Sequence, residues 1–399
     1  MGKNQSLWTL FIVTELYLLA NMPYMFTAIM PLPSIYVSSA LYVLIVTLFL
    51  LSGKHAESLP GKFNMTFFIT ILAWGMFGVI HDDSSYYTRI LFLLITYTLI
   101  TALYNRALFF KFWQYNNYFI LIQAVLSVIG FLMVGLGLLH PLVSTYYNNI
   151  VPVNYFGLCF SKTLMGNLIR PSGFFDEPGA LAGWAIYSLM FNYAFIKDKY
   201  VSKYLPYLTT VTLSIAYFIQ IAIFLLLSSI KRIYRLIPVA LLVIIGIYYI
   251  NKTQGSDFDV YEKTFARLEY SSETVIEGNS RQIRMDNAKA IFKQSPIVGV
   301  GGRVIGEMDL ETSDNPYEIL AKDGIIGYII SYLPLIGILF CNRRKEVLLG
   351  VLVIAVGYLQ RPLHINFIHD LYIWSFLLFA LIDSKSKSSK LSKPNYYSI

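Results

Sequence analysis

Charged residues are scarce in this 399-residue chain, and so are cysteine and histidine. Asp, Glu, Lys and Arg together make up 14% of the residues, compared with about 25% in an average soluble domain. This shortage excludes an ordinary water-soluble protein. What the chain has instead is 56% hydrophobic and 16% aromatic residues and a mean hydropathy of +0.58. Such a composition is typical of a polytopic membrane protein.

Apolar runs long enough to cross the ~30 Å hydrocarbon core of a bilayer recur along the chain. Alternation of the strand type is absent, so we expect helices rather than a barrel to span the lipid bilayer. The fold class is therefore an all-α polytopic membrane protein, with residues 1–399 as one integral membrane domain. The eleven predicted runs begin near Leu7, Ile35, Phe63, Ile90, Tyr118, Gly179, Leu205, Leu236, Gly324, Val347 and Asn366.

Lys and Arg are concentrated in alternate connections between these runs, which predicts that those connections face the cytoplasm. With them inside, both termini are cytoplasmic. The net charge of +8 then reflects orientation, and nucleic acid is not an expected partner. The basic segments are the N-terminus, 53–62, 105–113, 197–203, 229–235, 341–346 and the tail from Asp383.

The run from Leu205 to Ser228 has basic residues on both flanks. A hairpin of two tilted or re-entrant helices, bending near Thr209 to Ser214, keeps both flanks in the cytoplasm and gives twelve membrane segments in all. The alternative is a single ordinary helix with a reversed local topology.

Two long segments are predicted outside, 140–178 and 251–323, and we expect them to carry the function because long ordered loops are usually functional. A disordered cytoplasmic tail is expected over 384–399. The two cysteines fall on opposite sides of the membrane and cannot pair. Their spacing fits no zinc, haem or iron–sulfur site, so we expect no metal and no cofactor.

The first external segment ends in RPSGFFDEPGALAGW, Arg170 to Trp184. Two readings of its acids stay open. Glu177 followed by Pro178 suits the start of a helix, where an acid complements the helix dipole. The carboxylate of Glu177 or Asp176 also suits a general base, if its surroundings raise its pKa toward neutrality.

In the second external segment, Ser280 is predicted to cap a helix that contains Arg281 and Arg284 and stops before Pro296. These arginines are three apart, so they share a face of the first turn and suit a phosphate or pyrophosphate. The alternative is that they pair with nearby acids. The GVGGRVIG stretch, 299–306, fits neither a dinucleotide fingerprint nor a P-loop and is interpreted as a flexible turn.

A polar stretch then turns back into a span in SDNPYEILAKDGIIG, 313–327. Asp314 or Asn315 is expected to cap a short helix that carries Tyr317 and Glu318, and Gly324 is expected to break it. Between the last two spans, Arg361 and His364 lie at the predicted outer mouth. A histidine at such an interface is more often a satisfied polar residue than a catalyst.

These stretches carry a resemblance to a known family. RPSGFFDEPGALA is similar to the R-x-x-G-x-F-x-E-P-x-x-x-A signature of the Wzy-type O-antigen polymerases and the related O-antigen ligases. The series SRQIR, SPIVGVG and DNPYEILAKDGIIG resembles their second external loop. The likeness, which includes the predicted topology, covers nearly the whole chain.

The resemblance implies a metal-independent glycosyltransferase of the GT-C type at the outer face of the bacterial inner membrane. Its substrates would be undecaprenyl-pyrophosphate-linked glycans, and its partners a flippase and a chain-length regulator. It implies that cationic side chains clamp the pyrophosphate and that one side chain acts as base. The candidates for the clamp are Arg170, Arg281 and Arg284, those for the base are Glu177, Asp176, Glu318 and His364, and Asn315, Tyr317 and Arg361 are further substrate-binding candidates.

Two other functions remain open. O-antigen ligases typically carry a His-Asn pair where this chain has Asp314-Asn315, which favours a polymerase, although His364 could replace that histidine. A flippase for lipid-linked sugars would be expected to show internal repeats, and none is convincing here.

Overall fold

The computed structural model describes residues 59–105, 108–147, 151–162, 164–165, 168–175, 177–228, 281–308, 310–313, 315–360 and 367–388. The predicted spans that begin near Leu7, Ile35 and Leu236 lie outside these residues. The chain divides into two compact units, and each is described by itself. The first contains 111–279 and the second contains 45–110 and 280–399.

The described part of the chain is mostly helical, and five of its helices are long and apolar enough to cross a membrane. Their outer surfaces are apolar as well. Phe68, Val79 and Phe340, for example, are 61%, 75% and 81% exposed. Apolar surface on this scale needs an apolar solvent. The five are Gly61–His81, Ser85–Asn105, Phe109–Gly135, Pro178–Ile196 and Glu318–Cys341.

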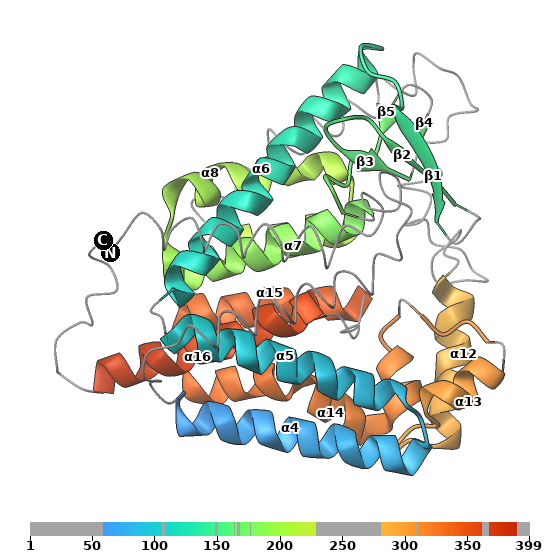
Figure 1. Ribbon diagram of the computed structural model, residues 1–399, viewed down its shortest axis with the longest axis vertical. Helices are drawn as coiled ribbons and strands as arrows, with labels where there is room; N and C mark the ends of the chain where they lie inside the picture. Colours follow the sequence, from blue (N-terminus) through green and yellow to red (C-terminus); the bar gives the residue numbers. More distant parts are fainter. Residues whose placement is uncertain are drawn as a thin grey trace. The chain divides into compact units, whose positions relative to one another are not determined.

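The second unit is a bundle in which α14 contacts α4, α15 and α16, and α5 contacts α4 and α16 (Figure 1). The shorter helix α12 packs on the start of α14 at one end of this bundle. The bounds are α4 Gly61–His81, α5 Ser85–Asn105, α12 Arg281–Gln294, α13 Gly302–Glu307, α14 Glu318–Cys341, α15 Lys345–Gln360 and α16 Phe367–Ser388.

Aromatic side chains fill the core of this bundle. Trp374 of α16 lies with its ring centroid 5.7 Å from that of Phe63 and 4.7 Å from that of Phe67, both on α4. Trp74 of α4 carries the guanidinium of Arg89 over its ring at 3.9 Å, with Arg89 itself buried. A cation held on an aromatic face is less costly to bury than an isolated one.

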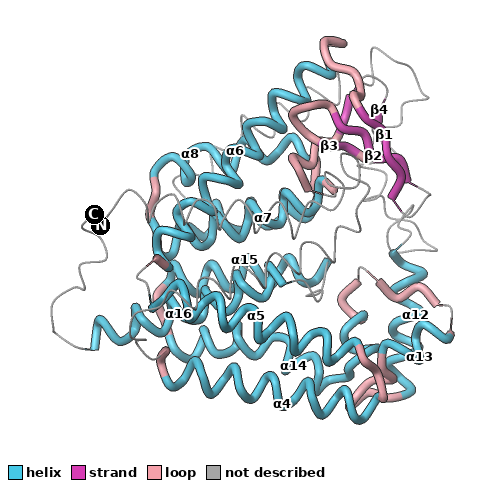
Figure 2. The backbone as a smooth tube through the Cα atoms, viewed as in Figure 1, coloured by secondary structure: helices cyan, strands magenta, loops and turns pink. Residues whose placement is uncertain are grey.

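The first unit combines helices with two small antiparallel sheets in its described residues (Figure 2). Strands β1, β2 and β3 pair in that order, and β4 pairs with β5. Helix α7 contacts both α8 and α9. The bounds are α6 Phe109–Gly135, β1 Val143–Tyr147, β2 Val151–Tyr155, β3 Phe160–Ser161, β4 Leu164–Met165, β5 Leu168–Ile169, α7 Pro178–Phe191, α8 Lys199–Leu208 and α9 Ile215–Ser228.

These strands correct the sequence prediction, which found no strand pattern anywhere. Strands β1 and β2 pair in register from Val143 opposite Tyr155 to Tyr147 opposite Val151. Both strands, VSTYY and VPVNY, are rich in β-branched and aromatic residues, but five residues are too few to stand out in so hydrophobic a chain. The segment 140–178, which was predicted to be external, is therefore partly strand in its described residues. It packs Phe156 and Cys159 against Val134 of α6.

The predicted break near Thr209 to Ser214 is confirmed. Helix α8 ends at Leu208, a 3-10 turn covers Thr209–Thr212, and Leu213 has a left-handed conformation with φ 49° before α9 begins. Tyr217 reaches back so that its hydroxyl donates to the carbonyl oxygen of Pro206 at 2.9 Å. The run is therefore two short helices rather than one ordinary span.

The two cysteines are free thiols, and Cys159 is buried. Burial raises the pKa of the Cys159 thiol to about 12, so it stays protonated near neutral pH. At the other end of the chain, α16 runs through Ser388. The expectation that the tail is disordered from residue 384 onward is therefore wrong for its first five residues. The remainder of that tail lies outside the described residues.

Helix α14 is interrupted near its start, as predicted, at Gly324. This residue has φ 64° and ψ −168°, a conformation available essentially to glycine alone. The loop after α12 pairs with the backbone on both sides of this break. The N–H groups of Val300 and Gly301 donate to the carbonyl oxygens of Ala321 and Lys322, and those of Ile325 and Ile326 donate to Pro296 and Ile297. The GVGGRVIG stretch is therefore held in place rather than flexible, which corrects its interpretation as a flexible turn.

We predict that Gly324→Ala destabilises the protein by about 2–3 kcal/mol, because an added Cβ would lie 2.4 Å from the Ile297 backbone at a strained dihedral. Thermal unfolding of the detergent-solubilised protein measures the loss. Gly306→Ala is the matched control, because a Cβ there meets nothing within 4 Å. Equal melting temperatures for the two variants would contradict this account of the break.

Candidate functional site

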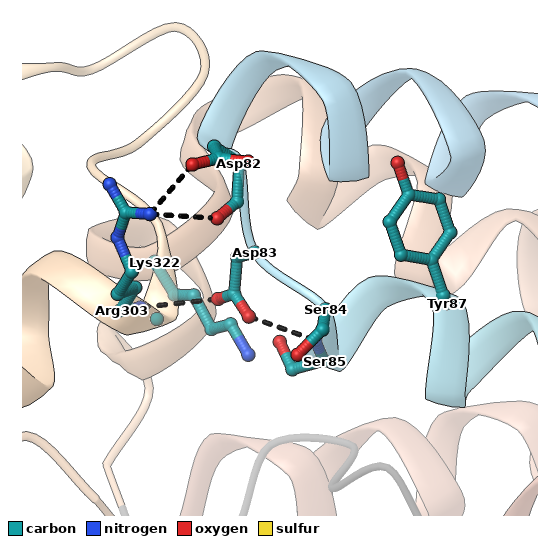
Figure 3. A pocket seen from close by; sticks show the side chains of 8 residues that line it. Asp82, Asp83, Ser84, Ser85, Tyr87, Arg303 and Lys322 are labelled. Carbon is teal, nitrogen blue, oxygen red and sulfur yellow. Dashed lines mark hydrogen bonds and ion pairs between the residues drawn. The ribbon is translucent and has the colours of Figure 1, made fainter.

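A polar pocket of about 680 Å³ lies at one end of the second unit, where the turn between α4 and α5 meets α13 and the start of α14 (Figure 3). We call this end, formed by residues 81–85 and 281–323, the polar end of the bundle. The pocket is lined by Asp82, Asp83, Ser84, Ser85, Tyr87, Gly302, Arg303 and Lys322.

Asp83 is the fixed acceptor of the pocket. Its Oδ1 accepts a hydrogen bond from the Ser85 N–H at 2.8 Å, and its Oδ2 accepts one from the Arg303 N–H at 3.1 Å. Burial raises the pKa of the Asp83 carboxyl, but the hydrogen bonds from Ser85 and Arg303 and the charge of Lys322 lower it more, so the pKa ends below its ordinary value. The carboxylate is therefore ionised at neutral pH.

Arg303 joins α13 to the same turn. Its Nη1 donates to Asp82 Oδ2 at 2.8 Å and to the Asp82 carbonyl oxygen at 3.1 Å, and its Nε lies 3.6 Å from Glu307 Oε1. Both Arg303 and Asp82 are exposed, so this ion pair contributes little to stability, about 1 kcal/mol at most. Figure 3 shows the guanidinium turned toward Asp82.

Lys322 is the second cation of the pocket, and it is half-buried on the first part of α14. In the part of the chain that the structure describes, its ammonium makes no hydrogen bond or ion pair. The next residue, Asp323, is buried and accepts a hydrogen bond from the Tyr86 hydroxyl at 2.5 Å. This bond ties the start of α5 to α14 and fixes the segment that carries Lys322.

The polar end depends on glycines where backbones approach closely. Gly299 has φ 72°, and a Cβ there would lie 2.2 Å from the Lys322 carbonyl oxygen. Gly301 has φ 83°, and a Cβ there would lie 3.0 Å from the His81 side chain. His81 in turn donates from Nε2 to the Val298 carbonyl oxygen at 2.9 Å. The sequence therefore places α13 directly on the α4–α5 turn.

Five of the predicted site residues lie in the described part of the same polar end. Arg284 donates from Nε to Glu311 Oε2 at 2.7 Å, which matches the alternative that this arginine pairs with an acid. Asn315 accepts the Tyr317 N–H on Oδ1 at 2.9 Å, and its carbonyl oxygen accepts the Glu318 N–H at 3.2 Å. Asn315 thus orders the turn before α14. The N-cap residue of this helix is Tyr317, whose side chain makes no capping hydrogen bond, so the prediction that Asn315 caps the helix is wrong.

Tyr317 packs on α12, against the cluster of Ala288, Ile291 and Ala321. Glu318 is half-buried in the first turn of α14. Arg281 is the first residue of α12, which has the expected length, while its side chain is not among those described. Ser280, Asp314, Arg361 and His364 lie outside the described residues.

In the first unit, Arg170 connects the end of the sheet to the bend between α8 and α9. Its Nε donates to the Thr212 carbonyl oxygen at 3.2 Å and its Nη2 to that of Leu213 at 3.1 Å. Glu177 is the N-cap residue of α7, with Pro178 in the first turn, as predicted. Its side chain makes no capping hydrogen bond. Asp176 lies outside the described residues.

Other positions of the same motif are structural. Gly173 has φ 60°, and a Cβ there would lie 3.0 Å from the Gln123 side-chain oxygen, which accepts the Phe174 N–H. Phe175 is buried. Much of the RPSGFFDEP stretch therefore builds the junction between the strands and α7.

The pocket residues were missed by the sequence analysis. The signal was the short HDDSS sequence, 81–85, between two apolar runs, followed far along the chain by Lys322 and Asp323. Nothing in the sequence shows that these segments meet, because the contact depends on the tertiary pairing of 296–301 with α14. In the described residues, no three His, Cys, Asp or Glu side chains are grouped as metal ligands would be.

Comparisons with protein-family models, with curated proteins and with solved structures find no match for this chain.

The lowered pKa of Asp83 predicts a pH-dependent contribution to stability. Because the folded pKa lies below the ordinary 3.8, the ionised carboxylate stabilises the fold at all pH values above 3.8, and this contribution is lost as the pH falls through the folded pKa. Asp83→Asn should therefore lower the melting temperature at pH 7, and the gap from wild type should close below pH 3.8. Asp82→Asn is the control, and a gap that stays constant with pH would contradict the prediction.

Proposed function

We propose that this protein is a glycosyltransferase that polymerises undecaprenyl-pyrophosphate-linked oligosaccharide repeat units at the outer face of the bacterial inner membrane. The product is an O-antigen or related surface polysaccharide. The proposal includes the finer architecture of about twelve membrane segments of the GT-C type with both termini cytoplasmic. Its partners are the lipid-linked donor and acceptor glycans, a flippase and a chain-length regulator.

One observation supports this proposal above the others. Charged and hydroxyl side chains line a pocket of about 680 Å³ at the end of the helix bundle where the α4–α5 turn meets α13, whereas the helix surfaces between the two ends of the bundle are apolar. A lipid-linked glycan has its hydrocarbon in the bilayer and its pyrophosphate and sugars at the bilayer surface. A site for it must therefore lie where apolar helices end and polar groups begin, and the polar end meets this demand.

The chemistry assigns a role to each kind of side chain. An acceptor hydroxyl attacks the anomeric carbon of the growing glycan, the carbon–oxygen bond to the pyrophosphate breaks, and undecaprenyl pyrophosphate leaves with the bonding electrons. A carboxylate takes the hydroxyl proton, for which Glu177 and Glu318 are the described candidates. Attack opposite the leaving group inverts the anomeric centre.

The leaving pyrophosphate gains charge as the bond breaks, and arginines suit it because they donate two parallel hydrogen bonds. Arg284 is paired with Glu311, which is 73% exposed. Such a surface pair is worth about 1 kcal/mol or less, so an arriving pyrophosphate can replace it. Arg170 already donates to two carbonyl oxygens. We therefore assign Arg170 to positioning the α8–α9 bend and Arg284 to the pyrophosphate clamp. Arg281, three positions before Arg284, belongs to the same clamp.

Deletion of the gene, followed by electrophoresis of the surface polysaccharide, tests the function. A polymerase deletion leaves the lipopolysaccharide core capped with one repeat unit. Bare core with long polymer retained on the lipid carrier would instead identify a ligase, and loss of every external repeat unit would identify a flippase.

Arg284→Lys, expressed in the deletion strain, should reduce polymerisation at least tenfold at normal protein level, because lysine cannot donate two parallel hydrogen bonds. Arg344→Lys is the matched control. Arg344 pairs with Asp383 at 2.7 Å beyond the other end of α14, and a lysine can keep that pair. Full activity of Arg284→Lys would remove Arg284 from the clamp.

A further inference from the structure

We infer that the pocket at the polar end binds an uncharged sugar residue of the repeat unit, through Asp83 and Lys322. This inference deepens the proposed function and rests on it for its role in polymerisation. The central geometry is the approach of these two side chains to Gly302. A Cβ placed on Gly302 would lie 2.8 Å from Lys322 Cε and 3.0 Å from both Lys322 Nζ and Asp83 Oδ2, so both side chains meet at this glycine in the pocket wall.

The two groups meet at Gly302 without an ion pair between them. Asp83 is held in place by the N–H groups of Ser85 and Arg303, and in the described residues Lys322 has no hydrogen-bond or ion-pair partner. The Lys322 ammonium lies over the Tyr86 ring, 5.2 Å from its centroid, which leaves its N–H donors open to a ligand. A fixed acceptor and a donor without a hydrogen-bond partner among the described residues therefore meet beside Gly302.

The charges that line the pocket decide the class of ligand. Two acids, Asp82 and Asp83, face two bases, Arg303 and Lys322. An anion placed here would lie against Asp83, whose lowered pKa keeps it ionised at neutral pH. A cation would lie against Arg303 and Lys322. A neutral ligand is repelled neither by the acids nor by the bases. The equal number of acids and bases therefore favours an uncharged molecule over the pyrophosphate itself.

Hydroxyl groups match the pocket best. A carboxylate only accepts hydrogen bonds and an ammonium only donates them, whereas a hydroxyl does both. One sugar hydroxyl can donate to Asp83, and it or its neighbour can accept from Lys322. The hydroxyls of Ser84 and Ser85 line the same pocket. Hydrogen bonds to ionised groups are the stronger ones, about 1.5–3 kcal/mol each.

Tyr87 supplies an apolar surface. It lines the pocket and is 51% exposed, and its ring lies against α4 at Gly78, where a Cβ would come within 3.0 Å of it. The carbon–hydrogen face of a sugar ring packs on such an aromatic side chain while the hydroxyls reach polar groups. The volume of about 680 Å³ lies within the roughly 300–1,000 Å³ of ligand pockets.

The test uses full-length protein in detergent and, as probe, the repeat unit of the host strain's own surface polysaccharide, released from its carrier by mild acid. Isothermal titration measures its binding. Gly302→Ala places a methyl group against Lys322 and Asp83 and displaces them, and Lys322→Met removes the donor, so each should weaken binding about tenfold or more. Gly306→Ala and Lys293→Met are the matched controls, because the first has open space around it and the second is exposed on α12.

The outcomes separate this inference from the proposed function. Unchanged binding in both pocket variants overturns the inference, even if the wild-type protein polymerises. Loss of binding in the pocket variants but not in the controls supports it, even if the wild type has no polymerase activity. Inorganic pyrophosphate is the second probe. Its binding should be the same in wild type and Lys322→Met, and its loss in Lys322→Met would identify an anion site instead. If Gly302→Ala does not fold, Lys322→Met alone decides.

Discussion

The backbone pairing of residues 296–301 with the broken start of α14 is the constraint on which the polar end depends. Four hydrogen bonds join these segments, and they require Gly299 and Gly324 because any Cβ at either position would collide with backbone. The pairing fixes where Lys322 emerges from α14 and where α13 begins. Asp83 then accepts a hydrogen bond from the Arg303 N–H, and this bond attaches the α4–α5 turn to the start of α13. A rigid pocket results, although most of its lining comes from short connections.

Membrane solvation explains why the chemistry is confined to such connections. In the lipid, every backbone polar group must be satisfied inside the protein, so the helices stay regular and apolar where they face it. Buried charge occurs where partners are built in, as with Arg89 on Trp74 and Asp323 with Tyr86. An irregular stretch such as Gly324 is tolerated because neighbouring backbone completes its hydrogen bonds. The glycan chemistry that we propose would therefore take place at the ends of the helices.

Hydropathy and local signals predicted the helices that the structure describes except α13, and also the bend after Leu208, the start of α7 at Glu177 and the break at Gly324. Each depends on a short stretch of sequence. The strands of 143–169 were not predicted because strands of two to five residues carry little periodic signal in the sequence. The pocket was not predicted because Asp83 and Lys322 are 239 positions apart in the sequence and meet only in the folded structure. Arg170 looked like an anion ligand because a sequence cannot reveal that carbonyl oxygens already accept from it.

Reconstitution tests the central claim most directly. The purified protein is placed in liposomes with undecaprenyl-pyrophosphate-linked repeat unit as the sole glycan, in the presence of a chelator, and the products are resolved by electrophoresis. The account predicts a ladder of lipid-linked glycans that grows by one repeat unit per step. A single unextended species, from protein that is folded and binds the free repeat unit, would contradict it.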